Sequence, residues 1–328
     1  AARAPSAASV DGFMASGGIF LAVIGVVWSL KIASQFLKFL FITFLRPGKN
    51  IKKLGSWAVV TGATDGIGLA LAKEIAAKGV NVVLVSRSAD KLKAAAAEIK
   101  EKSAVETKTI AFDFSQGSAA EYAKLGKQLE GLEIGLLYNN VGVSYDHAEL
   151  LQNLTDEKIA TIMEVNNAAL VKVTRLVLPG MLERRKGAIV NVGSLEGNIP
   201  APYYTIYGST KAFVEWFSTS MNVELWGTGV TMHAHVPLYV VTKMAIPNEK
   251  RRKPSMTTPM PSTWARASLR AIGYESVSIP YWAHAIMATI ALSMPTSRLS
   301  KMRSDQSKII RKIALKKKEQ AAAAGKAE

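Results

Sequence analysis

The feature that most restricts the fold of this chain is an alternation of short apolar runs and helical stretches, which begins at Trp57. The apolar runs are WAVVT, VNVVLVS, TKTIAFDF, IGLLYNN, AIVNV and VTMHAHV. Between them lie LALAKEIAAKG, ADKLKAAAAEIKEK and a stretch from Thr155 to Leu178, which we expect to stop before Pro179. Because apolar strands that alternate with helices form right-handed crossovers, this order predicts a parallel sheet within one domain of residues 51–275.

A glycine-rich loop, TGATDGIG, follows the first apolar run and opens a helix. Its glycines allow a tight turn, and they let a pyrophosphate approach backbone N–H groups at the positive end of the helix. The loop therefore predicts a dinucleotide site on a Rossmann-like, doubly wound parallel sheet of about seven strands; a turn without a ligand is the alternative. The predicted contacts are Gly62, Thr64, Asp65, Gly66, Ile67 and Gly68.

The end of the second strand distinguishes between dinucleotides. A carboxylate there would bind the ribose 2′-hydroxyl of NAD, but the sequence has Ser86 and Arg87. Since Arg87 can pair with a 2′-phosphate, NADP(H) is the predicted cofactor; a plain surface arginine is the alternative. Asp113, after the third strand, could accept a hydrogen bond from the adenine amino group or cap the next helix, and both interpretations stay open.

Polar residues also follow the later strands, at the edge where open α/β folds bind ligands. The fourth strand runs into NNVG, where we expect Asn139 to tie neighbouring loops together. Asn166 lies on an apolar helix face, where a buried amide needs a partner. Ser194 reaches the same edge because it follows the fifth strand. The further predicted cofactor contacts are Asn140, Gly142, Val240 and Thr242.

Two tyrosines stand four residues before a lysine, a spacing that puts both side chains on one helix face. Tyr207 and Lys211 lie in a long helical stretch, thirteen residues after Ser194. The residue thirteen positions before Tyr239 is Trp226, which can orient no carbonyl. We therefore predict that Tyr207 and Lys211 are catalytic and bind the cofactor, and interpret Tyr239 as a decoy near it.

An uncharged run from Phe13 to Leu30 is about the minimum length for a membrane span. A second apolar run, from Ile32 to Leu45, is expected to lie along the membrane interface. We expect a retained anchor at about residues 13–45, within an N-terminal segment of residues 1–50, rather than a cleaved signal peptide. Because Arg46 and three lysines follow the anchor at once, the positive-inside rule places the main domain in the cytosol.

The region after the sixth strand is interpreted as a substrate lid over residues 237–261, which includes the basic run from Lys250 to Lys253. Residues 276–328 are first apolar and then basic, and are expected to associate with a membrane. Ile279–Pro295 would lie on the surface or re-enter the membrane, and Lys308–Lys318 would form a basic amphipathic helix. A frayed, solvated helix is the alternative for the latter.

The formal net charge of +16 would suit nucleic acid, an anionic membrane or an anionic substrate. Because the positive charge lies beside apolar segments and no nucleic-acid module is recognised, membrane lipid is the predicted partner and nucleic acid is not. The chain has no cysteine, which excludes disulfides and thiolate chemistry. No spacing among its four histidines is typical of a metal site, so no metal is predicted.

TGATDGIG, NNVG, Asn166, Ser194 and the Tyr207–Lys211 pair together resemble the short-chain dehydrogenase/reductase family. Longer matches, such as WAVVTGATDGIG, GLEIGLLYNNVGVSY and PLYVVTKMA, resemble its membrane-bound very-long-chain 3-oxoacyl-CoA reductases, also called 17β-hydroxysteroid dehydrogenases type 12. NNVG in place of NNAG, and PLYVVT in place of PG-x-V-x-T, depart from the broader family but are shared with this subfamily.

The resemblance implies NADPH-dependent reduction of a long-chain 3-oxoacyl-CoA in fatty-acid elongation at the endoplasmic reticulum membrane. It implies other elongation enzymes as partners and leaves a homodimer open. Ser194 would hold the carbonyl, and Tyr207 would supply the proton, its pKa lowered by Lys211 and the oxidised nicotinamide. Asn166 would hold a water that relays protons to Lys211. Steroid or retinoid ketones are the alternative substrates; a catalytically idle NADP-binding membrane scaffold is the alternative of another class, against which the intact site residues argue.

Overall fold

The computed structural model describes residues 7–249 and 252–324, which form two separate units that divide after Pro47. In the first unit, α1 (Ala7–Leu40) continues into a π-helical turn, η1 (Phe41–Leu45). Lys31, where the sequence separates two apolar runs, lies over the ring of Trp28 at 5.2 Å and leaves the helix unbroken. Among the described residues, Gly18–Leu45 is the one helix long and apolar enough to cross a membrane, with a mean hydropathy of 1.8.

The second unit is built on a parallel sheet of seven strands in the order β3-β2-β1-β4-β5-β6-β7, as the sequence predicts. The order reverses at β1 and β4, and this reversal marks the crevice where open α/β sheets bind ligands. The strands are β1 (Trp57–Thr61), β2 (Asn81–Ser86), β3 (Thr107–Ala111), β4 (Ile134–Asn139), β5 (Gly187–Val192), β6 (Val230–His235) and β7 (Val277–Ser278).

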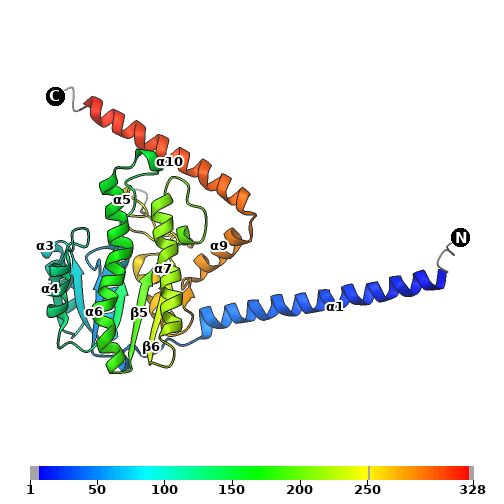
Figure 1. The fold of residues 1–328 in the computed structure, drawn as a ribbon, viewed down its shortest axis with the longest axis horizontal. Coiled ribbons are helices and arrows are strands. Elements are labelled where there is room, and N and C mark those ends of the chain that lie inside the picture. The colour runs from blue at the N-terminus through cyan, green and yellow to red at the C-terminus, as the bar shows by residue number, and fades with distance from the viewer. Residues whose placement is uncertain (1–6, 250–251, 325–328) are drawn as a thin grey trace. The chain divides into compact units, whose positions relative to one another are not determined.

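Helices cover both faces of the sheet, because alternate strand residues are buried on opposite sides. Val60 of β1 packs in one core with α2 (Gly66–Ala77), α3 (Ala89–Lys100) and α8 (Pro261–Ala271). Its neighbour Val59 packs in the other core with α4 (Ala119–Leu129) and α6 (Ala169–Glu183). On that second face, α6 and α7 (Thr205–Glu224) lie on the near side of β5 and β6 in Figure 1. Short 3-10 turns complete the unit at η2 (Ile51–Lys53), η3 (Leu151–Asn153) and η5 (Leu195–Gly197).

One long helical stretch differs from its prediction at both its interior and its end. α5 (Asp156–Met163) passes through a π-helical turn, η4 (Glu164–Ala168), into α6, which contains Pro179 and ends at Glu183. The predicted end at Leu178 is therefore wrong. Proline removes one hydrogen bond from the last turns, but Met181 beyond it is fully buried beside Gly187 of β5, and this burial favours continuation.

The C-terminal part of the chain packs as two helices of the second unit, α9 (Trp282–Ser293) and α10 (Thr296–Ala324). α9 buries Ala283, His284 and Ala288 but leaves Ile290 60% exposed. α10, the red helix of Figure 1, buries Leu299 and Ser307 on its inner side. One side of each helix therefore packs on protein, while the other keeps apolar side chains at the surface.

Candidate active site

The loops after β1 and β4 are tied together at the carboxyl edge of the sheet. The Thr61 hydroxyl, at the end of β1, accepts hydrogen bonds from the backbone N–H groups of Asn140 and Val141, both at 3.0 Å. The Asn140 side chain donates to the carbonyls of Thr61 at 2.9 Å and Gly62 at 3.3 Å. Asn140 therefore makes the loop connection that the sequence assigned to Asn139.

Asn139, the residue before Asn140, is buried, and its side chain fixes the sheet rather than the loops. Its amide donates to the Thr174 hydroxyl of α6 at 3.0 Å and to the Asn191 side chain of β5 at 2.8 Å. The prediction that Asn139 ties neighbouring loops is thus wrong. Successive strand residues point to opposite sides, so the side chain of the last strand residue turns into the core while that of the next reaches the loop.

The glycine-rich loop has the backbone that a close approach to phosphate requires. Gly62 and Gly66 have φ angles of +65° and +53°, which favour glycine. Asp65 caps α2 by accepting the N–H of Gly66 at 2.7 Å, and its other oxygen pairs with Lys243 at 2.8 Å. A Cβ on Gly66 would lie 3.1 Å from Thr242. The segment after β6 therefore closes over the loop, and Lys243 has a role there that the sequence did not reveal.

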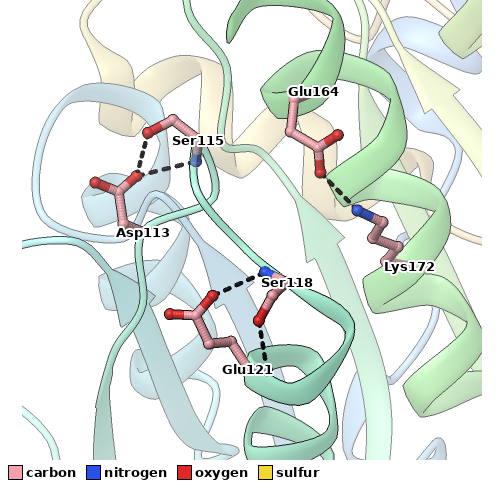
Figure 2. A network of polar contacts seen from close by, with 6 residues as sticks. All are labelled: Asp113, Ser115, Ser118, Glu121, Glu164 and Lys172. Atoms are coloured by element: carbon pink, nitrogen blue, oxygen red, sulfur yellow. Dashed lines mark hydrogen bonds and ion pairs between the residues drawn. The ribbon is translucent and has the colours of Figure 1, made fainter.

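Ser86, Arg87 and Asp113 lie beyond the glycine-rich loop. The Ser86 and Thr64 hydroxyls are 3.0 Å apart in a hydrogen bond, and Arg87 is exposed. Figure 2 shows that one Asp113 oxygen accepts both the N–H and the hydroxyl of Ser115, at 2.9 and 2.7 Å. Burial opposes ionisation, but these bonds and the charge of Arg87 lower the pKa of Asp113. Asp113 therefore stays ionised within reach of the charge of Arg87.

The helix that follows Asp113 is capped by another residue. Ser118 and Glu121 form a reciprocal capping box at the start of α4, which Figure 2 also shows. The interpretation of Asp113 as the cap of this helix is therefore wrong, because Asp113 lies five residues before the N-cap and closes a local turn. The adenine interpretation stays a prediction.

Ser194, Tyr207 and Lys211 meet at the same edge of the sheet. Ser194 follows β5, and its side chain is near enough to that of Tyr207 on α7 to lower the pKa of the phenol. The Lys211 ammonium, one turn further along α7, donates to the carbonyl of Val192 at 2.9 Å and lies 5.8 Å from the centroid of the Tyr207 ring. Figure 1 shows α7 beside β5 and β6, which explains how a strand end and a helix turn come together. The serine, the tyrosine and the lysine thus form one group.

Asn166 and Gly142 complete this group from the side of β4. Asn166, in the π-helical turn, accepts the N–H of Val143 at 2.8 Å and donates to Val143 and Thr210, both at 3.0 Å. A Cβ on Gly142 would lie 3.3 Å from the Asn166 side-chain oxygen and 3.6 Å from the Lys211 nitrogen. The π-helical turn thus aims the amide at the loop after β4, and Gly142 keeps open the space between Asn166 and Lys211.

Burial dominates the acid–base properties of Tyr207 and Lys211. Burial raises the pKa of Tyr207 to about 12; the nearby Ser194 side chain opposes this rise, and the charge of Glu196 adds to it. Burial lowers the pKa of Lys211 to about 8. The lowering of the Tyr207 pKa by Lys211 and an oxidised nicotinamide together stays a prediction. The Lys211 ammonium is held on the Val192 carbonyl, over the ring of Tyr207.

The predicted lid is fixed at its start by α9. The His284 ring accepts the N–H of Leu238 at 3.2 Å on one nitrogen and lies 3.1 Å from the Tyr239 carbonyl on the other, so it bonds the backbone of two consecutive residues. Burial lowers the pKa of His284 to about 4, which keeps the ring neutral. Val240 is buried behind this segment. In the basic run from Lys250 to Lys253, Lys250 and Arg251 lie outside the described residues.

Comparison with known proteins places this site in a defined group. Residues 56–253 match the family of short chain dehydrogenases. The chain is 45% identical over 245 residues to the very-long-chain 3-oxoacyl-CoA reductase of Bos taurus, and the aligned region covers 74% of this chain and 77% of that protein. It is 44% identical over 266 residues to the Homo sapiens reductase of the same name, and the aligned region covers 80% of this chain and 83% of that protein.

Solved structures share the fold across the second unit. A 7β-hydroxysteroid dehydrogenase structure has a TM-score of 0.70 at 25% identity and covers 78% of this chain and 99% of its own. A short-chain dehydrogenase from Sphingobium yanoikuyae, in complex with NADPH, has a TM-score of 0.61 at 30% identity. The match covers 73% of this chain and 96% of that chain.

Proposed function

Because this chain belongs to the short-chain dehydrogenase family, we propose that it is an NADPH-dependent reductase that converts 3-oxoacyl-CoA to 3-hydroxyacyl-CoA in very-long-chain fatty-acid elongation. The observation that carries the reaction type is the group of Ser194, Tyr207 and Lys211 at one sheet edge. The observation that supports the substrate is the identity to reductases of that name over most of their length.

The described residues fit a phosphorylated dinucleotide. The loop of left-handed glycines leads into α2, whose first N–H groups and positive end face an anion that approaches the loop. Arg87 offers a charged fork to a 2′-phosphate, and no carboxylate takes its place at the end of β2. We therefore assign NADP(H), with Asp113 beside the adenine and with Val240 and Thr242 at the nicotinamide end.

The protein groups divide the reduction between them, and the bound nicotinamide would supply the hydride. The Ser194 hydroxyl accepts the N–H of Glu196 at 3.3 Å, so its own proton is free to hold the ketone oxygen. Tyr207 donates the proton that this oxygen takes up. Its high pKa keeps the phenol protonated at neutral pH, as a proton donor must be. Lys211 holds positive charge beside the ring, and Asn166 positions the loop at Val143.

The test is NADPH oxidation by detergent-solubilised protein, with 3-oxostearoyl-CoA and estrone offered in parallel. We expect turnover of the acyl-CoA, a loss of about 10²–10⁴-fold in Tyr207→Phe, and little change in Tyr239→Phe. Full activity in Tyr207→Phe would show that another group donates the proton. The steroid arm is needed because a hydroxysteroid dehydrogenase shares the fold. If estrone is much the better substrate, a steroid ketoreductase replaces the acyl-CoA reductase with the same chemistry.

The membrane location follows from both ends of the chain. We assign Gly18–Leu45 as an anchor in the endoplasmic reticulum membrane, with the second unit in the cytosol because basic residues follow the helix. The outer side of α10 exposes Met302, Ile309 and Ile313 in one line. Exposed basic residues flank this line at Arg298, Lys301, Lys308, Lys312 and Lys316. Such a face suits an anionic lipid surface.

The membrane surface of α10 can be tested on the full chain in lipid nanodiscs. We expect slower backbone hydrogen exchange in residues 298–318 when the nanodiscs contain anionic lipid than when they contain neutral lipid alone. Equal exchange in both would contradict the lipid assignment.

The proposed partners are the long-chain acyl-CoA, other elongation enzymes and a second copy of the chain. For the homodimer, α7 exposes Trp216 at 74% and Phe213 at 42%. Light scattering of wild type and Trp216→Glu would test it, because a charge at this face should yield monomers. Co-purification with the other elongation enzymes tests the remaining association.

A further inference from the structure

The inner side of α10 carries two arginines that bond to two loops at the catalytic edge of the sheet. Arg303 forms an ion pair with Glu196, and the two side chains are only 14% and 19% exposed. Two turns later, Arg311 bonds to Glu149 at 2.7 Å, and those side chains are 27% and 12% exposed. Burial opposes ionisation of Glu149, but the bonds from Arg311, the Asn153 side chain and the Leu150 N–H lower its pKa to about 2. Both pairs fix the same helix, but only one of them reaches the catalytic group.

Glu196 lies in the turn that presents the catalytic serine. Its backbone N–H donates to the Ser194 hydroxyl at 3.3 Å. The N–H of the preceding residue, Leu195, donates to the Pro237 carbonyl at 3.2 Å, and the N–H of Gly197 donates to the Ser194 carbonyl at 2.9 Å. A Cβ on Gly197 would overlap the backbone of α7 at Lys211, so the turn lies directly against the catalytic helix. A shift of the Glu196 side chain would therefore move the turn that holds Ser194.

The titratable groups around Tyr207 come from three elements. Lys211 lies on its own helix, Glu196 on the turn after β5 and Tyr239 on the segment after β6. Glu196 raises the pKa of Tyr207, whereas Arg303, on α10, forms an ion pair with Glu196. A carboxylate this close to the proton donor opposes loss of its proton unless a cation balances it.

We propose that Arg303 is a positioning residue for the reduction, because its ion pair with Glu196 fixes the Ser194 turn and balances the carboxylate beside Tyr207. The C-terminal helix is then part of the site, although it contributes no group that touches the ketone. Arg311 fixes the same helix without this effect, because Glu149 lies on a separate loop. The inference rests on the proposed reduction for its kinetic readout only.

The experiment compares pH profiles of NADPH-dependent reduction for full-length wild type, Arg303→Gln, Arg311→Gln and the double variant Glu196→Gln/Arg303→Gln. In Arg303→Gln we expect the apparent pKa of the proton donor to rise by about one pH unit and kcat/KM near neutral pH to fall about tenfold. Arg311→Gln should keep the wild-type profile. The double variant should return the apparent pKa to the wild-type value, because it removes the unbalanced carboxylate.

Equal losses in Arg303→Gln and Arg311→Gln without a shift in pH profile would overturn the proposal, since α10 would then be a tether only. A double variant that keeps the shifted profile would also overturn it. The profile can be measured with any ketone that the wild type reduces, so a wrong acyl-CoA assignment fails separately. The carbon-13 resonance of the Tyr207 ring, identified by its loss in Tyr207→Phe, reports the same titration without turnover.

Discussion

Asn140 offers the sharpest test of how the site is built. Its amide is the donor that joins the loop after β4 to the glycine-rich loop, with bonds to the carbonyls of Thr61 and Gly62. In Asn140→Ala both bonds are lost, at about 0.5–1.5 kcal/mol each, or about 1–3 kcal/mol together. If the loop must be reordered when the dinucleotide binds, Kd for NADPH should rise about 5–100-fold, because 1.4 kcal/mol is about tenfold.

Asn140→Asp separates the donor from the shape of the side chain. A carboxylate of nearly the same size would face two carbonyl oxygens, so this variant should be less stable and bind NADPH more weakly than the alanine variant. Fluorescence titration with NADPH gives Kd, and thermal unfolding without cofactor gives stability. Asn81→Ala is the matched control, because Asn81 bonds to the N–H of Glu106 at 2.9 Å, at the opposite end of the sheet.

The reasoning fails if Asn140→Ala binds NADPH within about twofold of wild type, or if the aspartate variant is as stable as the alanine variant. The first result would mean that the glycine-rich loop holds its shape without this amide. The second would mean that the amide bonds to water rather than to the two carbonyls.

Three further predictions concern single positions. Arg87→Ala should raise Kd for NADPH about 10–100-fold, as loss of a charged hydrogen bond does, and leave Kd for NADH nearly unchanged in the same titration. Gly142→Val should reduce kcat at least about tenfold while the circular dichroism spectrum stays normal, because the valine methyl groups would displace the Asn166 amide and the Lys211 ammonium. An unchanged kcat would contradict the packing, in which a Cβ at position 142 lies 3.3 Å from the Asn166 oxygen and 3.6 Å from the Lys211 nitrogen. Glu215 is 7% exposed, and burial raises its pKa, so the folded state binds more protons than the unfolded state above the ordinary carboxyl pKa. The free energy of unfolding should therefore fall as pH rises through that window. Glu215→Gln should abolish this fall and gain about 1–2 kcal/mol of stability at pH 7, measured by urea unfolding. An unchanged pH dependence in Glu215→Gln would contradict the assignment of the fall to this carboxyl group.

The alternation of apolar runs, the glycine-rich loop and the spacing of Tyr207 from Ser194 were enough to predict the parallel sheet and its catalytic edge. These features are local in the sequence, and the period of two or of 3.6 residues determines which side chains face the core. The continuation of α6 through Pro179 was missed, because burial of Met181 depends on a strand that follows later in the chain. Asn139 and Asn140 were interchanged for a similar reason: the side of a strand on which a residue lies is decided where the strand ends.

The sequence by itself determined the fold class, and it was enough to predict a nicotinamide dinucleotide site and the serine, tyrosine and lysine that we propose for the chemistry. Only the tertiary structure decided how charge is distributed around them. Glu196 and Arg303 are separated by more than a hundred residues, and no local pattern connects them, yet α10 brings them together. The pKa of Tyr207 depends on burial and on that neighbouring carboxylate, and both arise only when distant segments pack.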